Sequence, residues 1–221
     1  MSQVILFEND EPKTIFAPIY KWYMYEGEVK VRDIRDTILS KEKEVINAHE
    51  YESDWNTGLG KNSMTSRSSS YNLLKWKEAD HIKDIIRNSH DNLITTLDAN
   101  MWEDKIYVQC WANVIRKGER IKPHQHWNSK YTYLGGHICL DDYDTHTYYI
   151  NPYTKKTFDT KNVKGKVYLF PNWLEHYTDT YKGDDVRVTI AFDIITQTVY
   201  CLLYTSPSPR DRTRSRMPSS A

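Results

Sequence analysis

The chain has 221 residues, a hydrophobic content of 39% and a formal net charge of zero at pH 7. This length suits one domain with a single core. The neutral balance argues against a nucleic-acid or membrane surface, because such partners usually require a basic excess. The N-terminus lacks a targeting pattern, no apolar run approaches the roughly 18 residues of a membrane span, and the cysteines are few and scattered. We therefore expect a soluble, cytoplasmic domain.

The composition changes abruptly near Cys201, where the chain becomes rich in Ser, Pro and Arg and loses hydrophobic periodicity. Such a segment is not expected to pack. It resembles translated sequencing-adaptor read-through that has replaced a short native C-terminus, and a basic tail that binds nucleic acid is the alternative. We therefore assign residues 1–200 to the domain and residues 201–221 to a disordered, non-native tail.

The N-terminal half is predicted to begin with an extended segment and to continue into two helices. Residues 4–23 are expected to be extended because two prolines interrupt them. Hydrophobic spacing favours an amphipathic helix over residues 26–45 and a second, clearer one over residues 78–101. Residues 51–72 are rich in Ser, Asn, Gly and Thr, which predicts a loop long enough to act as a lid.

After residue 102 the hydrophobic pattern switches to a period of two, which is typical of strands. Strands are predicted over residues 106–115, 131–140, 145–150, 166–170 and 186–195. Helices followed by a run of antiparallel strands predict an α+β protein that is mainly β. The expected architecture is a jelly roll with the N-terminal helices packed on one outer face.

Two histidines separated by one residue, His124 and His126, follow Pro123 near the end of a predicted strand. Residues two apart on a strand point to the same side, so this pair can offer two imidazoles to one metal ion. A third histidine, His176, follows an apolar strand and would complete a three-ligand site with positions open for substrate and oxygen. Histidines that only form hydrogen bonds are the alternative.

The last predicted strand carries Arg187, Thr189 and Ala191 on one face, and apolar residues on the other. A buried guanidinium without a partner is costly, whereas a carboxylate satisfies its planar donors, and the Thr189 hydroxyl adds a further hydrogen bond. A small dicarboxylate ligand is therefore indicated. The alternative is an internal salt bridge to one of three nearby carboxylates, namely Glu175, Asp184 and Asp185.

The histidine pair, the apolar strand that leads to His176, and the Arg-x-Thr sequence that follows resemble the iron(II)- and 2-oxoglutarate-dependent oxygenases. The resemblance is closest to a family common in marine phages and bacteria. Three segments carry it over roughly residues 5–196: the opening Ile-Phe-Ala-Pro-Ile-Tyr, the strand that contains Trp111, and the Gly-x-x-x-x-Phe-Pro block that ends at His176.

The resemblance implies a double-stranded β-helix in which His124, His126 and His176 hold Fe(II) and Arg187 and Thr189 bind 2-oxoglutarate. Two further hydroxyl groups are candidate donors to the cosubstrate, those of Tyr131 and Tyr133, and aromatic packing of these two rings is the alternative. The implied enzyme is a dioxygenase that uses O2 and couples oxidative decarboxylation of 2-oxoglutarate to hydroxylation of an unidentified small molecule or peptide, with ascorbate as a candidate reductant. It would act in the host cytoplasm if a phage encodes it.

One position departs from the family pattern. The broader superfamily has a carboxylate ligand two residues after the first histidine, where this chain has His126. The second ligand is therefore either His126 or a carboxylate such as Asp142. Two other functions stay open: a three-histidine cupin-type dioxygenase that needs no 2-oxoglutarate, and a non-catalytic jelly-roll binding module.

Overall fold

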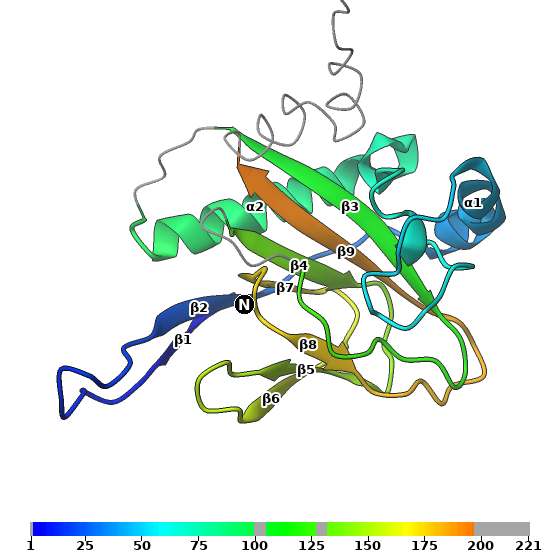
Figure 1. Ribbon diagram of the computed structural model, residues 1–221. Helices are drawn as coiled ribbons and strands as arrows, with labels where there is room; N and C mark the ends of the chain where they lie inside the picture. Colours follow the sequence, from blue (N-terminus) through cyan, green and yellow to red (C-terminus); the bar gives the residue numbers. More distant parts are fainter. Residues whose placement is uncertain (1, 100–104, 127–131, 197–221) are drawn as a thin grey trace, which may run out of the picture.

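Two antiparallel sheets face one another in the computed structural model, which describes residues 2–99, 105–126 and 132–196 (Figure 1). The larger sheet contains, in spatial order, β1 (Gln3–Glu8), β2 (Lys21–Glu28), β7 (Lys166–Pro171), β4 (Leu134–Cys139), β9 (Arg187–Thr196) and β3 (Ile106–Ile115). The smaller sheet contains β6 (Thr157–Lys161), β5 (His146–Ile150) and β8 (His176–Thr178). Between β4 and β9 the chain passes from the larger sheet to the smaller one and back twice. The predicted double-stranded β-helix is therefore confirmed.

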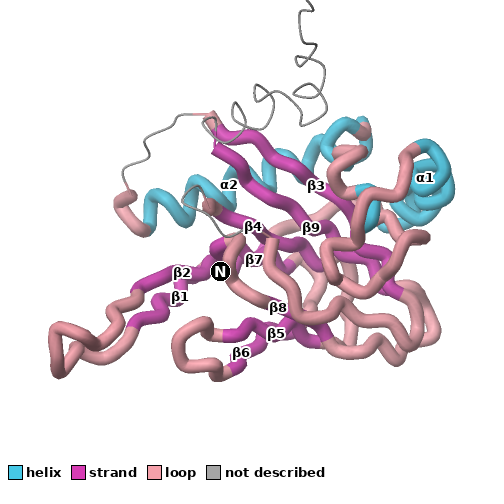
Figure 2. Tube along the Cα trace, viewed as in Figure 1, coloured by secondary structure: helices cyan, strands magenta, loops and turns pink. Residues whose placement is uncertain are grey.

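The two helices lie on the side of the larger sheet that faces away from the smaller sheet (Figures 1 and 2). They are α1 (Arg35–Ala48) and α2 (Asp80–Thr96), and three short 3₁₀ turns accompany them: η1 (Thr65–Arg67), η2 (Leu73–Lys75) and η3 (Lys77–Ala79). Alternate residues of β9, such as Ile190 and Phe192, pack with apolar residues of α2, such as Ile82 and Ile86, in one buried cluster. The prediction of helices on one outer face is confirmed.

The predicted helix over residues 26–45 begins later in the structure, at Arg35. Residues up to Glu28 belong instead to β2. This strand lies between β1 and β7, so that Tyr25 pairs with Val4 on one side and with Leu169 on the other. The pairing with Leu169 joins β2 to a segment far away in the sequence, and local periodicity does not reveal such a contact. The strand predicted over residues 106–115 is confirmed as β3, and the second helix ends at Thr96, earlier than predicted.

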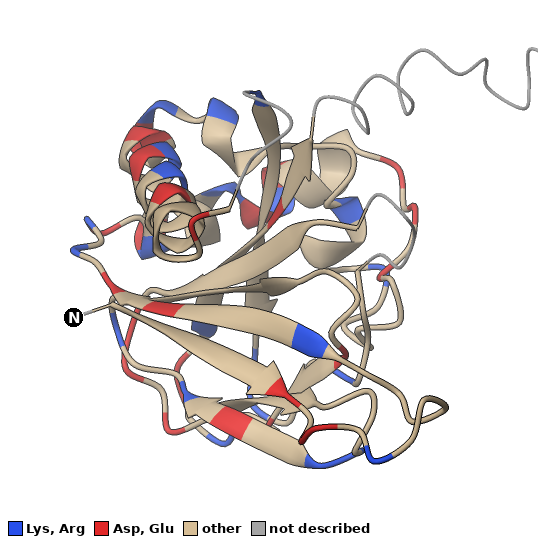
Figure 3. Cartoon of the chain, turned by 90° about the vertical axis from the view of Figure 1, so that its left-hand side faces the viewer, with Lys and Arg blue, Asp and Glu red and all other residues tan. Residues whose placement is uncertain are grey.

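The surface carries charges of both signs, interspersed over helices and loops (Figure 3). The outer part of the β1–β2 hairpin projects away from the body of the protein and bears the exposed Ile15 and Phe16 (Figure 1). No helix within the described ranges has the length and apolarity needed to cross a membrane.

Two of the three cysteines, Cys110 and Cys139, are buried and free. Burial raises the pKa of both thiols, that of Cys139 to about 12. Both therefore act as small core residues. Cys201 and the predicted tail over residues 201–221 lie outside the described residues.

Replacing Ile86 by Ala should lower the free energy of unfolding by about 2–5 kcal/mol, because the change leaves a cavity between α2 and the larger sheet. Ile86 is 1% exposed, whereas Ile15 is 93% exposed, so Ile15→Ala serves as a matched control with an expected change within about 0.5 kcal/mol. Urea unfolding of both variants measures the difference. Equal midpoints would show that this cluster is not the core of the domain.

Candidate metal centre

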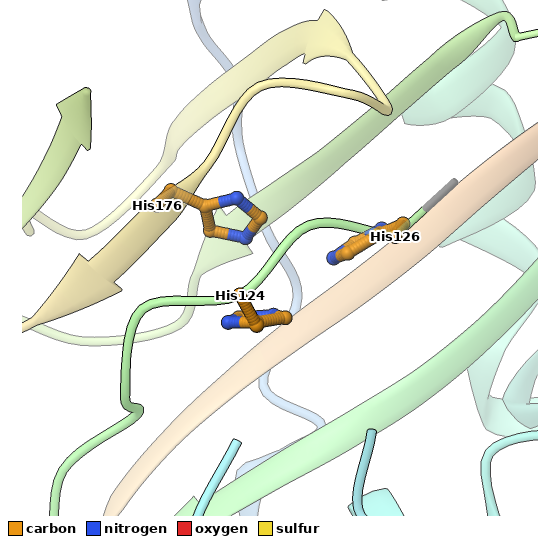
Figure 4. Close-up of side chains that lie close together, drawn as sticks. All are labelled: His124, His126 and His176. Atoms are coloured by element: carbon orange, nitrogen blue, oxygen red, sulfur yellow. The ribbon is translucent and has the colours of Figure 1, made fainter. Parts of the chain in front are cut away.

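Three histidines from two distant parts of the sequence meet between the sheets. One ring nitrogen from each of His124, His126 and His176 lies within 4.8 Å of the others. The extended segment that carries the first two runs beside β8, where the His124 N–H donates to the His176 carbonyl at 3.1 Å and the His176 N–H donates back at 2.9 Å. Figure 4 shows the three rings gathered around one point. The structure thus brings together all three predicted ligands.

Local backbone geometry fixes the tautomers of two of these rings. The Nδ1 of His124 lies 2.9 Å from the Lys122 carbonyl oxygen, and the Nδ1 of His176 lies 2.9 Å from the Leu174 carbonyl oxygen. A carbonyl only accepts hydrogen bonds, so each Nδ1 carries the ring proton. In a neutral ring the lone pair is then on Nε2, which is the form that binds a metal ion.

The environment favours the neutral form of His124 and His176. Burial, together with the nearby His126 ring, lowers the pKa of His124 to about 4. Burial and the two neighbouring rings also lower the pKa of His176 well below its usual value. Three converging imidazoles fit a single divalent transition-metal ion, since imidazole nitrogen suits iron, zinc, copper and nickel.

The histidines line a cavity of about 490 Å³ between the sheets, and Arg187 of β9 lies in the same cavity. The Arg187 residue is 1% exposed, and its Nε and Nη1 are buried without a hydrogen-bond partner among the described residues. Burial lowers the pKa of its guanidinium. Thr189, Ala191 and Asp193 follow along the same face of β9 and also line the cavity. The predicted alternation of this strand is confirmed.

The internal salt bridge that was the alternative for Arg187 is not formed by the predicted carboxylates. Asp185 pairs with Arg35 at 2.7 Å, Asp184 pairs with Lys117 at 2.5 Å, and Glu175 is exposed. None of these three carboxylates therefore forms a salt bridge with Arg187, and its Nε and Nη1, which have no partner among the described residues, are available to a carboxylate ligand.

Other predicted site residues lie elsewhere. The Tyr133 hydroxyl is 2.8 Å from His90 Nε2 of α2, and Tyr133 is not among the cavity-lining residues, so its position does not support a contact with the cosubstrate. Tyr131 lies outside the described residues. Asp142 is exposed and accepts a hydrogen bond from the Lys164 backbone N–H at 2.9 Å, so it does not join the histidine group.

The structure adds cavity residues that sequence reasoning missed. They are Asp193, Asn172, His137 and Trp111. The signal for Asp193 was present in the sequence, because it continues the inward-facing alternation of β9 two residues beyond Ala191. No comparable signal pointed to Asn172, which lies in the turn after β7.

The chain thus has a double-stranded β-helix fold that encloses three imidazoles and a buried arginine in one cavity, and the three imidazoles could hold one metal ion. Residues 109–193, somewhat under half of the chain, match the model of a family described as "Putative 2OG-Fe(II) oxygenase". The resemblance expected from the sequence, to the 2-oxoglutarate- and iron(II)-dependent oxygenases, is thus confirmed over these residues.

Several solved structures are similar to this chain at low sequence identity. EvdMO1 is 13% identical, with a TM-score of 0.50 over 89% of this chain and 55% of that protein. A prolyl hydroxylase from Trichoplax adhaerens, solved with a hypoxia inducible factor peptide fragment, is 12% identical, with a TM-score of 0.49 over 81% and 86%. A prolyl-4-hydroxylase from Pseudomonas putida is 9% identical, with a TM-score of 0.45 over 57% and 70%. A comparison with curated proteins gave no match.

The metal-free protein should lose stability on acidification, in part through His137. Burial, and then the nearby Arg187 charge, lower the pKa of His137 from 6.5 to about 3. The unfolded chain therefore binds more protons than the folded one between these values, and the free energy of unfolding falls as the pH drops from about 6.5 to about 3. His137→Gln, which does not titrate, should show a shallower fall in urea unfolding across this range, and an unchanged slope would contradict the assignment.

Proposed function

We propose that the protein is an iron(II)- and 2-oxoglutarate-dependent dioxygenase that hydroxylates a small molecule or a peptide. The observation that carries this proposal is the buried Arg187, whose Nε and Nη1 have no hydrogen-bond partner among the described residues, in the same cavity as three imidazoles. A metal ion alone does not explain that cation, whereas a ligand with a metal-binding keto acid at one end and a carboxylate at the other explains both. The family match over residues 109–193 supports the same function.

His124, His126 and His176 would hold Fe(II) through nitrogen and leave positions for other ligands. When bound, the iron supplies the redox chemistry that converts 2-oxoglutarate and O2 to succinate and carbon dioxide while one oxygen atom enters a C–H bond of the substrate.

The protein groups bind and orient the cosubstrate. Arg187 would pair with its distal carboxylate, an interaction strengthened by the low dielectric of the buried site. Thr189, two residues along the same face of β9, would donate a further hydrogen bond to it. Because these two residues would hold the distal carboxylate of 2-oxoglutarate in place, they would also set how close its keto-acid end comes to the imidazoles.

Arg187→Ala should raise the concentration of 2-oxoglutarate needed for half-maximal succinate release by about 10- to 100-fold, because charge-assisted hydrogen bonds of about 1.5–3 kcal/mol are lost. Arg187→Lys, which keeps the charge but not the planar pair of donors, should fall between this variant and the wild type. Arg87→Ala, on the exposed face of α2, is the control and should match the wild type. Equal cosubstrate requirements in all four proteins would contradict the clamp. Oxygen uptake without 2-oxoglutarate would favour the three-histidine dioxygenase instead.

Divalent metal should stabilise the wild type, since a ligand that binds only the folded state adds about 2.7 kcal/mol at a hundred times its dissociation constant. An anaerobic melting experiment with Fe(II) should show this increase, with a further one when 2-oxoglutarate is added. His176→Ala should lose most of the metal effect, whereas His146→Ala on β5, outside the cavity lining, should keep it. No metal effect in the wild type would favour the non-catalytic binding module.

A further inference from the structure

We infer that Asp193 is a positioning residue of the metal centre: it orients His126 and gives the ligand set the negative charge that three imidazoles lack. The inference rests on the metal site of the proposed function and names a residue that acts on the ion through His126.

The contact between the two side chains is close and sheltered. The Nδ1 of His126 lies 2.6 Å from Oδ1 of Asp193, and the side chains are 9% and 24% exposed. A carboxylate accepts the Nδ1 proton in such a charge-assisted bond, which holds the ring orientation and leaves the Nε2 lone pair free. The two ring nitrogens point to opposite sides of the imidazole. The carboxylate on Nδ1 therefore lies outside the ligand set.

His126 differs from His124 and His176 in the kind of group that accepts a hydrogen bond from its Nδ1. The acceptors for His124 and His176 are backbone carbonyls two residues earlier in the same segment, so each turn fixes its own ring. The acceptor for His126 is a side chain 67 positions away, on β9 of the larger sheet. Asp193 thus ties the ligand segment to the strand that also carries Arg187.

The neighbouring strand leaves the space that this contact needs. Gly135 of β4 lies directly across from Asp193 in the sheet register. A Cβ at position 135 would stand 3.2 Å from Oδ1 of Asp193 and 3.2 Å from Nδ1 of His126, and only 2.3 Å from Oδ1 of Asn172. Any larger residue at position 135 would therefore push apart the groups that meet there.

Two aromatic rings flank His126. The ring centroids of Trp111 and Phe170 lie 5.6 and 6.3 Å from the centroid of the His126 ring.

The charge of Asp193 matters because the ligands themselves carry none. A divalent ion bound by three neutral imidazoles keeps its full charge in a site where the only other described ionic side chain lining the cavity is the cationic Arg187. A carboxylate on the far nitrogen of one ligand makes that imidazole more basic and offsets part of this charge. A carboxylate ligand at position 126 would place its negative charge directly on the ion. Asp193 supplies this charge instead from the far side of the His126 imidazole.

The test is direct Co(II) binding to the full chain, followed by the visible absorption of the bound ion, without cosubstrate or turnover. Asp193→Ala should weaken binding by about 10- to 100-fold. Asp193→Asn, which keeps an oxygen acceptor but loses the charge, should weaken it less. Asp185→Ala removes an exposed carboxylate just before the same strand and should bind as the wild type does. Metal-free melting of each variant identifies any loss of folding.

A double-variant cycle separates positioning from a merely structural role. If Asp193 acts through His126, then Asp193→Ala should have little further effect on Co(II) affinity in a His126→Ala background. Equal affinities for the wild type and Asp193→Ala would overturn the inference. So would full additivity of the two substitutions, which would make Asp193 either a ligand in its own right or a general support of the fold. A wild type that binds Co(II) but releases no succinate would disprove the proposed function and leave this inference standing.

Discussion

A pair of backbone hydrogen bonds between His124 and His176 makes the site, because it joins two segments that lie far apart in the chain. The bridge aligns the 121–126 segment with β8 and turns the side chains of both histidines into one cavity. Once that alignment is set, the strand period carries His126 to the same side. The convergence of the three imidazoles is thus an outcome of sheet geometry, and the candidate metal site needs no separate scaffold.

The strand β9 serves the core and the site at the same time. Its even-numbered residues, such as Ile190, pack towards the helices, while Arg187 and Asp193 face the cavity. A shift of register by one residue would exchange these two sets and bury the charged groups against α2. The apolar packing that stabilises the fold therefore also fixes which way the functional side chains point.

Much of this arrangement could be predicted, because strand alternation is a local property. The pattern over residues 106–115 and the inward face of β9 needed no knowledge of partners. The start of α1 and the short strands β6 and β8 could not be predicted, since they depend on pairing with distant segments such as the Tyr25–Leu169 pair. The position of Tyr133 likewise follows from a contact with α2, a tertiary interaction that its neighbours in sequence do not reveal.

The burial of the two cysteines affects which metal ions the proposed site would bind. Thiolates would compete with imidazole for soft ions such as copper(I) and zinc, but Cys110 and Cys139 stay protonated at neutral pH because burial raises the pKa of each. An ion that enters the barrel thus meets only nitrogen and oxygen donors among the described residues of its cavity. If the cavity holds the proposed oxygen-activating iron, the absence of these thiols from its lining would also protect them from oxidation by reactive oxygen species formed there.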